Sequence, residues 1–270
     1  MRKLIVIALL LLLPCAVFGG AGGKGFGGKG IAAGEVSFTP ADLTGNQVWL
    51  EADIEVYSDA GSTLCDTDGQ NVQQWNDQTS NGYDVSAGTT PLYKTAIKNS
   101  LPVVRFGIDG FGDPLTSNLD TSALSNNLKP FTIAMVIQSR SVTTDNTIIG
   151  GTSDAGISVD ISGSHFRLLK QATTLIGSNT ATISVDTWYI LVVTYDGSGN
   201  YAFRVNGADD GSGTSDQTFS GSNTRIGVDA AGTGARFQGD MGSLLINSTV
   251  LSSGNIAALE NYWNSKWGIY

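Results

Sequence analysis

The sequence predicts an all-β fold, a sandwich of two antiparallel sheets with one C-terminal helix packed on it. Apolar runs of strand length recur along the chain, and Gly, Ser, Thr, Asn and Asp fill the segments between them. The segment DGSGN at residues 196–200 joins two such runs with the residue types that tight hairpin loops require. A helical apolar pattern stands out only near the end of the chain, so we expect a single helix.

The expected strands differ in how apolar they are. Residues 131–139 and 188–196 are long and mostly apolar, as strands buried on both faces should be. In the run 201–207, apolar residues alternate with small or polar ones, which indicates one buried face. The expected strands are 47–51, 102–106, 131–139, 188–196, 201–207, 224–229 and 242–251.

The expected helix lies within residues 252–268. Its apolar residues recur at the spacing of one helical face, and this stripe should dock on the β sandwich. Ser252 or Ser253 can cap its start, and Gly268 can end it. The stripe consists of Ile256, Leu259, Trp263 and Trp267.

The beginning of the chain has the pattern of a secretory signal peptide. A basic start, Arg2 and Lys3, precedes an apolar run and then small residues, so we expect export and removal of residues 1–20. Lipidation at Cys15 is disfavoured, because a proline precedes it where a small residue is required. The glycine-rich residues 21–35 are expected to form a flexible arm, followed by one domain over residues 36–270.

Charge limits the possible partners. The whole chain has a net charge of −9, but four of its 15 basic residues precede Ile31, while all 24 acidic residues follow it. The body from Ile31 onward therefore has a net charge of −13, which disfavours nucleic acid and strongly anionic polysaccharides. Neutral glycans, protein surfaces and calcium remain candidate partners. No later stretch is apolar and long enough to span a membrane.

Cysteine is scarce. Beyond Cys15, the only cysteine is Cys65, so no internal disulfide is expected in an exported chain. A small, partly buried residue is the favoured interpretation of Cys65, and an intermolecular bridge is the alternative.

Seven segments carry a family resemblance: VWLEAD (48–53), VQQWNDQTSNGYDV (72–85), LPVVRFGIDG (101–110), FTIAMVIQS (131–139), WYILVVTYDGSGNYAFRVNG (188–207), RFQGDMGSLLINSTVLS (236–252) and ALENYWNSKWGIY (258–270). In this order they resemble the laminin-G-like jelly-roll branch of the concanavalin A-like lectin/glucanase superfamily. The resemblance extends from about residue 42 to the end and implies a jelly-roll sandwich. It leaves function open, since such domains include lectin-like modules, adhesion modules, enzyme appendages and phage or surface proteins.

The segment VQQWNDQTSNGYDV combines an aromatic ring, a carboxylate, hydroxyls and amides in few positions. In the family it resembles a strand, a turn and a second strand, so Trp75 should bury its ring. Asp77 can accept hydrogen bonds from the backbone N–H groups two and three residues on, as in an Asx-turn. Asn81 and Gly82 suit positions with positive φ. A turn is the favoured interpretation, and direct ligand contact is the alternative.

The sequence offers little for catalysis. The catalytic branches of the superfamily use an E-x-D-x-x-E motif, whereas the nearest pattern here is EADIE, with Glu51, Asp53 and Glu55. Strict alternation would place these three on one strand face, and a solvated edge is the simpler interpretation. His165 is the only histidine and is expected at a strand edge.

Calcium is the candidate cofactor. Its preferred ligands are carboxylates and backbone carbonyls in loops. The loop CDTDGQN supplies Asp66 and Asp68, and the expected loop GADDGSG supplies Asp209 and Asp210. For each loop, the ordinary chemistry of polar turns is the favoured interpretation, and calcium binding is the alternative.

Sugar binding typically uses aromatic rings beside amides and carboxylates. Tyr83, Tyr93, Tyr201 and Phe111 lie in or near expected loops, and the first three are the candidate ligand-binding residues. We expect a secreted, non-catalytic glycan-binding module. The first alternative is a structural or adhesive protein of a cell surface or particle, and the second is a glycan hydrolase or lyase.

Overall fold

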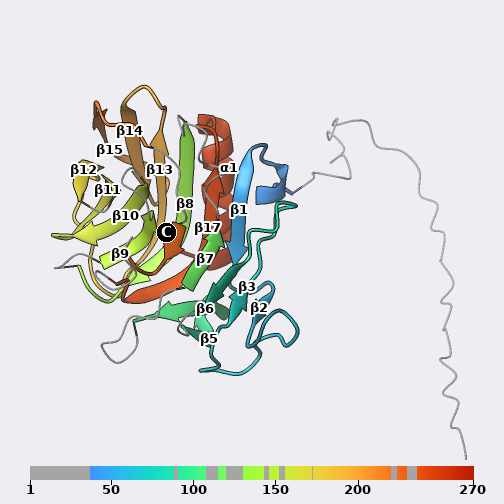
Figure 1. Ribbon diagram of the computed structural model, residues 1–270. Coiled ribbons are helices and arrows are strands. Elements are labelled where there is room, and N and C mark those ends of the chain that lie inside the picture. Colours follow the sequence, from blue (N-terminus) through green and yellow to red (C-terminus); the bar gives the residue numbers. More distant parts are fainter. Residues whose placement is uncertain are drawn as a thin grey trace, which may run out of the picture. The chain divides into compact units, whose positions relative to one another are not determined.

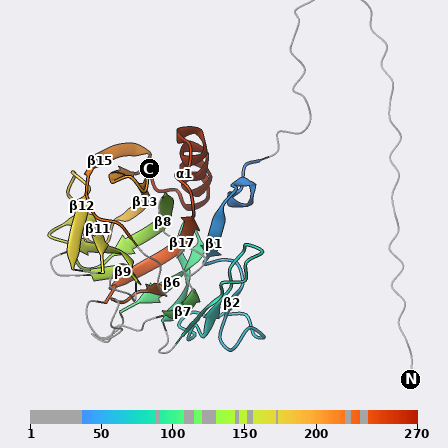
Figure 2. The same cartoon turned by 45° about the horizontal axis from the view of Figure 1, so that its top comes forward.

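Two antiparallel sheets face each other, and one α-helix covers the outer side of one of them (Figure 1 and Figure 2). A computed structural model describes residues 37–87, 91–107, 115–119, 130–142, 146–151, 156–171, 173–219, 224–229 and 236–270. The expected signal peptide, the glycine-rich arm and Phe111 lie outside these residues. The predicted all-β sandwich is confirmed.

The first sheet, sheet A, carries the helix. In spatial order it contains β15 (Ala208–Thr214), β14 (Asn200–Val205), β13 (Trp188–Tyr195), β8 (Phe131–Ser139), β17 (Gly239–Asn247), β6 (Leu101–Phe106) and β5 (Leu92–Lys98). An eighth strand, β1 (Asn46–Glu51), pairs with the second half of β17, while β6 pairs with the first half. A short 3₁₀ helix, η1 (Pro40–Asp42), precedes β1.

The second sheet, sheet B, is built mostly of shorter strands. Its spatial order is β12 (Thr174–Ser178), β11 (His165–Lys170), β10 (Ile157–Ser162), β9 (Asn146–Gly151), β16 (Thr224–Ile226), β7 (Leu115–Leu119), β4 (Val85–Ala87), β3 (Gln74–Trp75) and β2 (Val56–Tyr57). Trp75 is fully buried, as expected.

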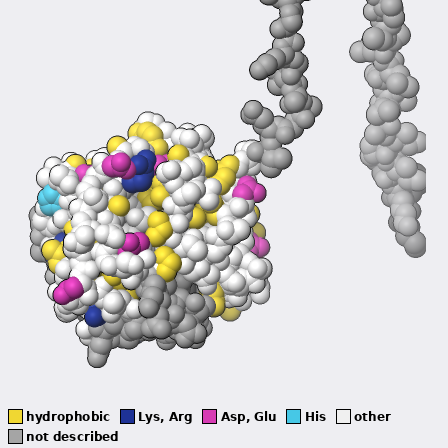
Figure 3. All heavy atoms as spheres, turned by 90° about the horizontal axis from the view of Figure 1, so that it is seen from above, with side chains coloured by type: hydrophobic (Ala, Val, Ile, Leu, Met, Phe, Trp, Pro, Cys, Tyr) yellow, Lys and Arg dark blue, Asp and Glu magenta, His cyan; other side chains and the backbone are white. Residues whose placement is uncertain are grey.

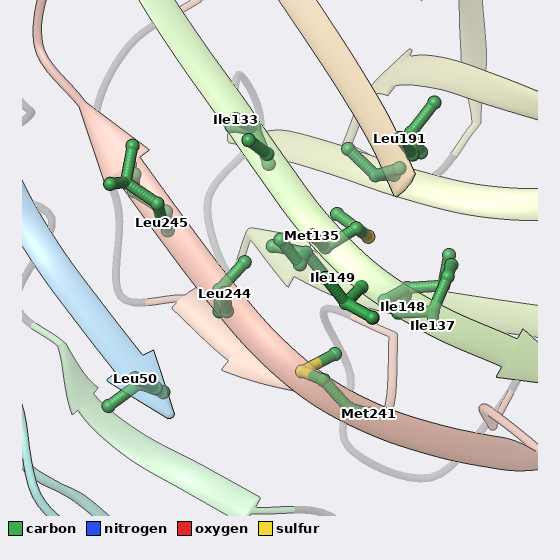
Figure 4. Close-up of a cluster of buried hydrophobic side chains, with 14 of the residues drawn as sticks. Leu50, Ile133, Met135, Ile137, Ile148, Ile149, Leu191, Met241, Leu244 and Leu245 are labelled. Carbon is green, nitrogen blue, oxygen red and sulfur yellow. The ribbon is translucent and has the colours of Figure 1, made fainter. Parts of the chain in front are cut away.

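The main core lies between the two sheets. In Figure 4, side chains of β8 and β17 in sheet A lie beside Ile148 and Ile149 of β9 in sheet B. The other face of β8 is buried too, because Thr132 Oγ1 accepts a hydrogen bond from the backbone N–H of Leu251, just before the helix (3.0 Å). Burial on both faces explains why residues 131–139 are almost continuously apolar.

The helix α1 (Ser253–Trp267) begins and ends as the sequence predicts. The Ser252 hydroxyl accepts a hydrogen bond from the backbone N–H of Asn255 (3.2 Å), and Gly268 takes the left-handed conformation at the end (φ 61°). The predicted stripe is buried, with Trp263 and Trp267 fully so.

A glycine in β17 makes room for the helix. A Cβ at Gly242 would lie 2.7 Å from the ring of Trp267, so a larger residue there would push the indole away. The same indole stacks on Trp188 of β13, with ring centroids 6.3 Å apart. The helix therefore contacts the sheet through close aromatic packing.

We predict that Trp263→Ala lowers the free energy of unfolding by about 3–5 kcal/mol, because it removes a buried indole and leaves a cavity between helix and sheet. Urea denaturation of both proteins would measure the difference. Leu175→Ala, at a residue that is 55% exposed, is the control and should change stability by at most about 0.5 kcal/mol. An unchanged midpoint in Trp263→Ala would show that the helix does not stabilise the sandwich.

Candidate functional site

The three acidic side chains of the segment EADIE do not share a strand face. β1 ends at Glu51, Asp53 lies in the turn that follows, and Glu55 has a left-handed backbone conformation (φ 51°). The alternation that would align the three carboxylates therefore stops at Glu51, and that expectation is wrong.

Glu51 is a fully buried carboxylate, not part of a solvated edge. It accepts hydrogen bonds from the indole N–H groups of Trp49 (2.9 Å) and Trp263 (3.0 Å) and from the Ser243 hydroxyl (2.6 Å). The ammonium of Lys266 supplies a fourth contact at 3.0 Å. A carboxylate enclosed by four donors is closed to substrates, so its role is to fasten α1 to β1 and β17.

Lys266 joins the turn after β1 to the same cluster, since its ammonium also contacts the carboxylate of Asp53 at 2.7 Å. Burial opposes the charge of Lys266, but the attraction of Glu51 and Asp53 outweighs it, and the pKa of Lys266 lies above its ordinary value. The ammonium is therefore held charged in the folded protein.

A polar pocket of about 240 Å³ opens beside β1. Trp49, which is 9% exposed, and Leu43 supply apolar wall, and uncharged polar side chains complete it. We call this the polar pocket. Its polar side chains are those of Asn46, Gln78, Thr79, Ser80 and Asn81.

The loop on one side of the polar pocket is held by Asp77, which is 7% exposed. Its carboxylate accepts hydrogen bonds from the backbone N–H groups of Trp49 (2.9 Å), Thr79 (3.0 Å) and Tyr83 (3.1 Å). The bond from the backbone N–H of Thr79, two residues after Asp77, is the expected Asx-turn. The bonds from Trp49 and Tyr83 come from residues more distant in the sequence than the three positions predicted. Of the pair expected to have positive φ, only Gly82 (φ 69°) does.

The same loop covers the free edge of β1. The backbone N–H of Gln78 donates to the carbonyl of Trp49 (2.8 Å), and the Asn81 amide donates to the carbonyls of Asn46 (3.0 Å) and Gln47 (3.1 Å). These bonds satisfy backbone groups that an exposed edge strand would leave open. The segment 72–85 is therefore both a structural turn and the wall of a pocket.

A second, more apolar pocket of about 430 Å³ lies between sheet A and the start of α1. We call it the outer groove. Val192 and Ala202 form part of its floor, and Val250 and Ile256 border it from the helix side. Arg204 lines it too, but its guanidinium is already bound to the buried carboxylate of Glu260 (3.0 and 3.1 Å).

The three candidate tyrosines lie on different elements. Tyr83 is half-buried in the loop after β3, and Tyr93 lies in β5 with its side chain 9% exposed in the core. The ring of Tyr201 occupies the space over Gly177 and Gly213, where a Cβ would lie less than 3 Å from it. None of the three lines the polar pocket or the outer groove.

The candidate calcium ligands Asp66 and Asp68 lie in an exposed turn, where protein donors contact both. Asp68 pairs with the ammonium of Lys94 and accepts a hydrogen bond from the backbone N–H of Thr95 (3.0 Å). Asp66 accepts one from the Thr67 hydroxyl (2.8 Å). Such contacts are those of an ordinary polar turn.

Asp209 and Asp210 do not lie in a loop, contrary to the sequence prediction. Asn206 and Gly207 both have positive φ (51° and 79°) and form a two-residue hairpin turn, so the chain turns back into β15 at once. The sequence did not predict this edge strand, because it contains two consecutive Asp residues and Asp is rare in strands.

These two carboxylates are also occupied by protein donors. Asp209 pairs with Arg204, and Asp210 accepts from the Asn179 amide (2.6 Å) and the backbone N–H of Ala181 (2.7 Å). Asp210 thereby links β15 of sheet A to the segment after β12 of sheet B. In the described ranges, no group of three or more His, Cys, Asp or Glu residues is placed to hold a metal ion. The residues present do not fit a calcium site, and the calcium prediction gains no support from them.

Among the described residues, the buried Nδ1 atom of His165 has no hydrogen-bond partner, while Cys65 has ordinary apolar surroundings. His165 begins β11 at the hairpin with β10, as expected. Cys65 is a buried free thiol, and burial raises its pKa to about 11, so it is protonated and unreactive at neutral pH.

The family is shown by the sequence as well as by the fold. Residues 112–257, more than half of the chain, match the family model described as the concanavalin A-like lectin/glucanases superfamily. The chain therefore belongs to this superfamily. The sequence matches no curated protein.

Solved structures with a similar fold include receptor-binding domains of botulinum neurotoxins. The serotype G binding domain is 14% identical with a TM-score of 0.58, covering 83% of this chain and 54% of its own. The serotype D domain in complex with N-acetylneuraminic acid is 14% identical with a TM-score of 0.55. That match covers 81% of this chain and 51% of the toxin domain. The DC domain in complex with rat synaptotagmin II is 16% identical with a TM-score of 0.53, and the match covers 81% of this chain and 51% of that domain. The chain spans about half the length of these domains.

None of the described helices is both long and apolar enough to cross a bilayer.

We predict that Lys266 contributes stability that is lost at alkaline pH. Its pKa is raised in the folded protein above its ordinary value of 10.5, so the contribution is complete below pH 10.5 and declines as the pH rises through the folded pKa. Urea unfolding at several pH values should show Lys266→Met less stable than the wild type at neutral pH, with a gap that narrows above pH 10.5.

Lys98→Met, in β5, is the matched control and should show a smaller difference at neutral pH. A Lys266→Met gap that is constant across this range would contradict the raised pKa.

Proposed function

We propose that this domain is an exported, non-catalytic carbohydrate-binding module whose ligand lies in the polar pocket. One observation carries the proposal: a concave site that Trp49 lines together with uncharged amides and hydroxyls. Sugars present weakly apolar ring faces and many hydroxyls, which match an indole and neutral hydrogen-bonding groups respectively. The volume of about 240 Å³ is below the usual range for drug-sized ligands, and it suits a single sugar ring.

The fold and its relatives support this function. The superfamily contains lectins by its own description, and the solved neighbours include binding domains in complex with N-acetylneuraminic acid and SialylT. Export is supported by the basic and apolar pattern of the first 20 residues.

The structural or adhesive alternative has less support. A protein that acts by self-association should expose a large contiguous apolar patch. Figure 3 shows hydrophobic side chains in several separate groups on the face that it displays. The large exposed hydrophobic residues also belong to different segments, among them Leu64, Leu175 and Val185.

We predict that the protein binds a subset of glycans on an array and that Ser80→Trp lowers this binding at least roughly tenfold, because the indole fills the pocket. Ser80 is exposed, and its side chain makes no hydrogen bond to the described part of the chain, so the fold should tolerate the change. Ser253→Trp, which fills the outer groove instead, is the matched control and should bind like the wild type.

If glycan binding fell equally in both variants, or only in Ser253→Trp, the polar pocket would not be the binding site. The same array in EDTA should give unchanged binding, since the four candidate calcium ligands already have protein partners. A silent array with a stable oligomer in solution would favour the structural alternative.

We further predict no glycan hydrolysis. Glu51, the acidic residue nearest to the superfamily's catalytic pattern, is sealed in the protein interior. Reducing-sugar release from β-glucans, galactans and alginates should remain at the level of a blank. Turnover that disappears in Glu51→Gln would contradict this prediction.

A further inference from the structure

Hydrogen bonds within the described chain leave two amide oxygens of the polar pocket without a donor. The Asn81 nitrogen donates to the carbonyl oxygens of Asn46 (3.0 Å) and Gln47 (3.1 Å). Both partners are backbone carbonyls, which only accept, so the nitrogen must face them and the amide cannot be flipped. The two N–H bonds of this amide are thus used within the protein, and its oxygen points the other way.

Gln78 follows the same rule. Its nitrogen donates to the Glu55 carboxylate (3.2 Å) and to the backbone carbonyl of Asn76 (3.2 Å), and both of these again only accept. The nitrogen is therefore fixed on the protein side, and the side-chain oxygen of Gln78 is left over. Neither this oxygen nor that of Asn81 accepts a hydrogen bond from another described residue.

The remaining polar side chains add few donors. The Asn46 nitrogen donates to the Pro40 carbonyl (2.6 Å), and the Thr79 hydroxyl donates to Asp77 (2.6 Å). Among the described side chains that line the pocket, the Ser80 hydroxyl and the second N–H of the Asn46 amide remain to donate, while the side-chain oxygens of Gln78 and Asn81 remain to accept.

Carboxylates outnumber cations near the pocket, where the ammonium of Lys266 is already paired with Glu51 and Asp53. Glu55 is one hydrogen bond away through Gln78, and Asp77 is one hydrogen bond away through Thr79. No Lys or Arg is among the described residues that line the pocket, and the body from Ile31 onward has a net charge of −13. A carboxylate or sulfate in the pocket would therefore find repulsion and acceptor oxygens, whereas a neutral sugar brings the hydroxyl donors that those oxygens need.

We infer that the polar pocket selects neutral sugars that present hydroxyl or amide donors, and rejects sialic acids, uronic acids and sulfated sugars. This inference rests on the proposed function. It separates the chain from those structural neighbours whose complexes contain N-acetylneuraminic acid or SialylT. The rejection follows from the carboxylates beside the pocket and from its unused acceptor oxygens, and it does not need a change in the size of the pocket.

The test uses matched pairs of probes on one array: lactose with 3′-sialyllactose, galactose with galacturonic acid, and N-acetylglucosamine with its 6-sulfate. The wild type should bind the neutral member of each bound pair at least roughly tenfold more strongly than its anionic partner. Ser80→Arg, which places a cation and new donors at the pocket, should reduce that ratio at least roughly threefold. Ser184→Arg, on the exposed segment between β12 and β13, adds the same charge elsewhere and should leave the ratio unchanged.

The outcomes are distinct. Equal binding of both members, or preference for the anionic one, overturns the inference and leaves the binding function standing. A ratio that shifts equally in Ser80→Arg and Ser184→Arg assigns the selectivity to overall charge and overturns the role of the pocket. An array silent for every pair overturns the proposed function, and the inference with it. If Ser80→Arg fails to fold, the ratio measured for the wild type still decides.

Discussion

The buried carboxylate of Glu51 is the interaction on which the rest of the arrangement depends. It receives donors from β1, β17 and α1, so three segments that are far apart in the sequence meet at one acceptor. Removing any single donor would leave the charge less well compensated in the interior, which is costlier than the loss of an ordinary surface contact. The cluster also reaches the polar pocket, because Trp49 donates to Glu51 with its indole nitrogen and is one of the residues that line the pocket. Helix docking and pocket shape are thus determined together.

The two candidate sites differ in what their surroundings allow. The polar pocket lies where a loop covers the edge of β1, so the bonds that protect the edge also decide which amide atoms remain available. The outer groove lies between sheet A and the start of α1, and its Arg204 is bound to a carboxylate of α1. In the polar pocket, most side-chain N–H and O–H donors are already bound within the protein. The few hydrogen-bonding groups that remain therefore decide which ligands fit.

Much of the fold was predictable because it follows periodicity. The long apolar strand at residues 131–139 matches β8, and the stripe that ends at Trp267 matches α1. The carboxylates of Asp209 and Asp210 concealed an edge strand, since local composition favoured a loop. The candidate site was harder to predict from the sequence than the fold. Asn81 was recognised only as a turn residue, and the position of Trp49 beside it results from a contact between segments some 30 residues apart. No local pattern marks Glu51 as buried, because a carboxylate in a short strand normally faces solvent.

The pairing of β1 with β17 has a consequence for how the protein is made. Asn46 and Asn247, which contact each other across this pair, are 201 positions apart in the chain. At a synthesis rate of about 5–20 residues per second, the first strand waits roughly 10–40 s for its partner. During that interval Trp49 and Glu51 have neither β17 nor α1 to contact. Sheet A is therefore completed only after residues 239–267 have been made, and until then the apolar surface of the early strands lacks its partners.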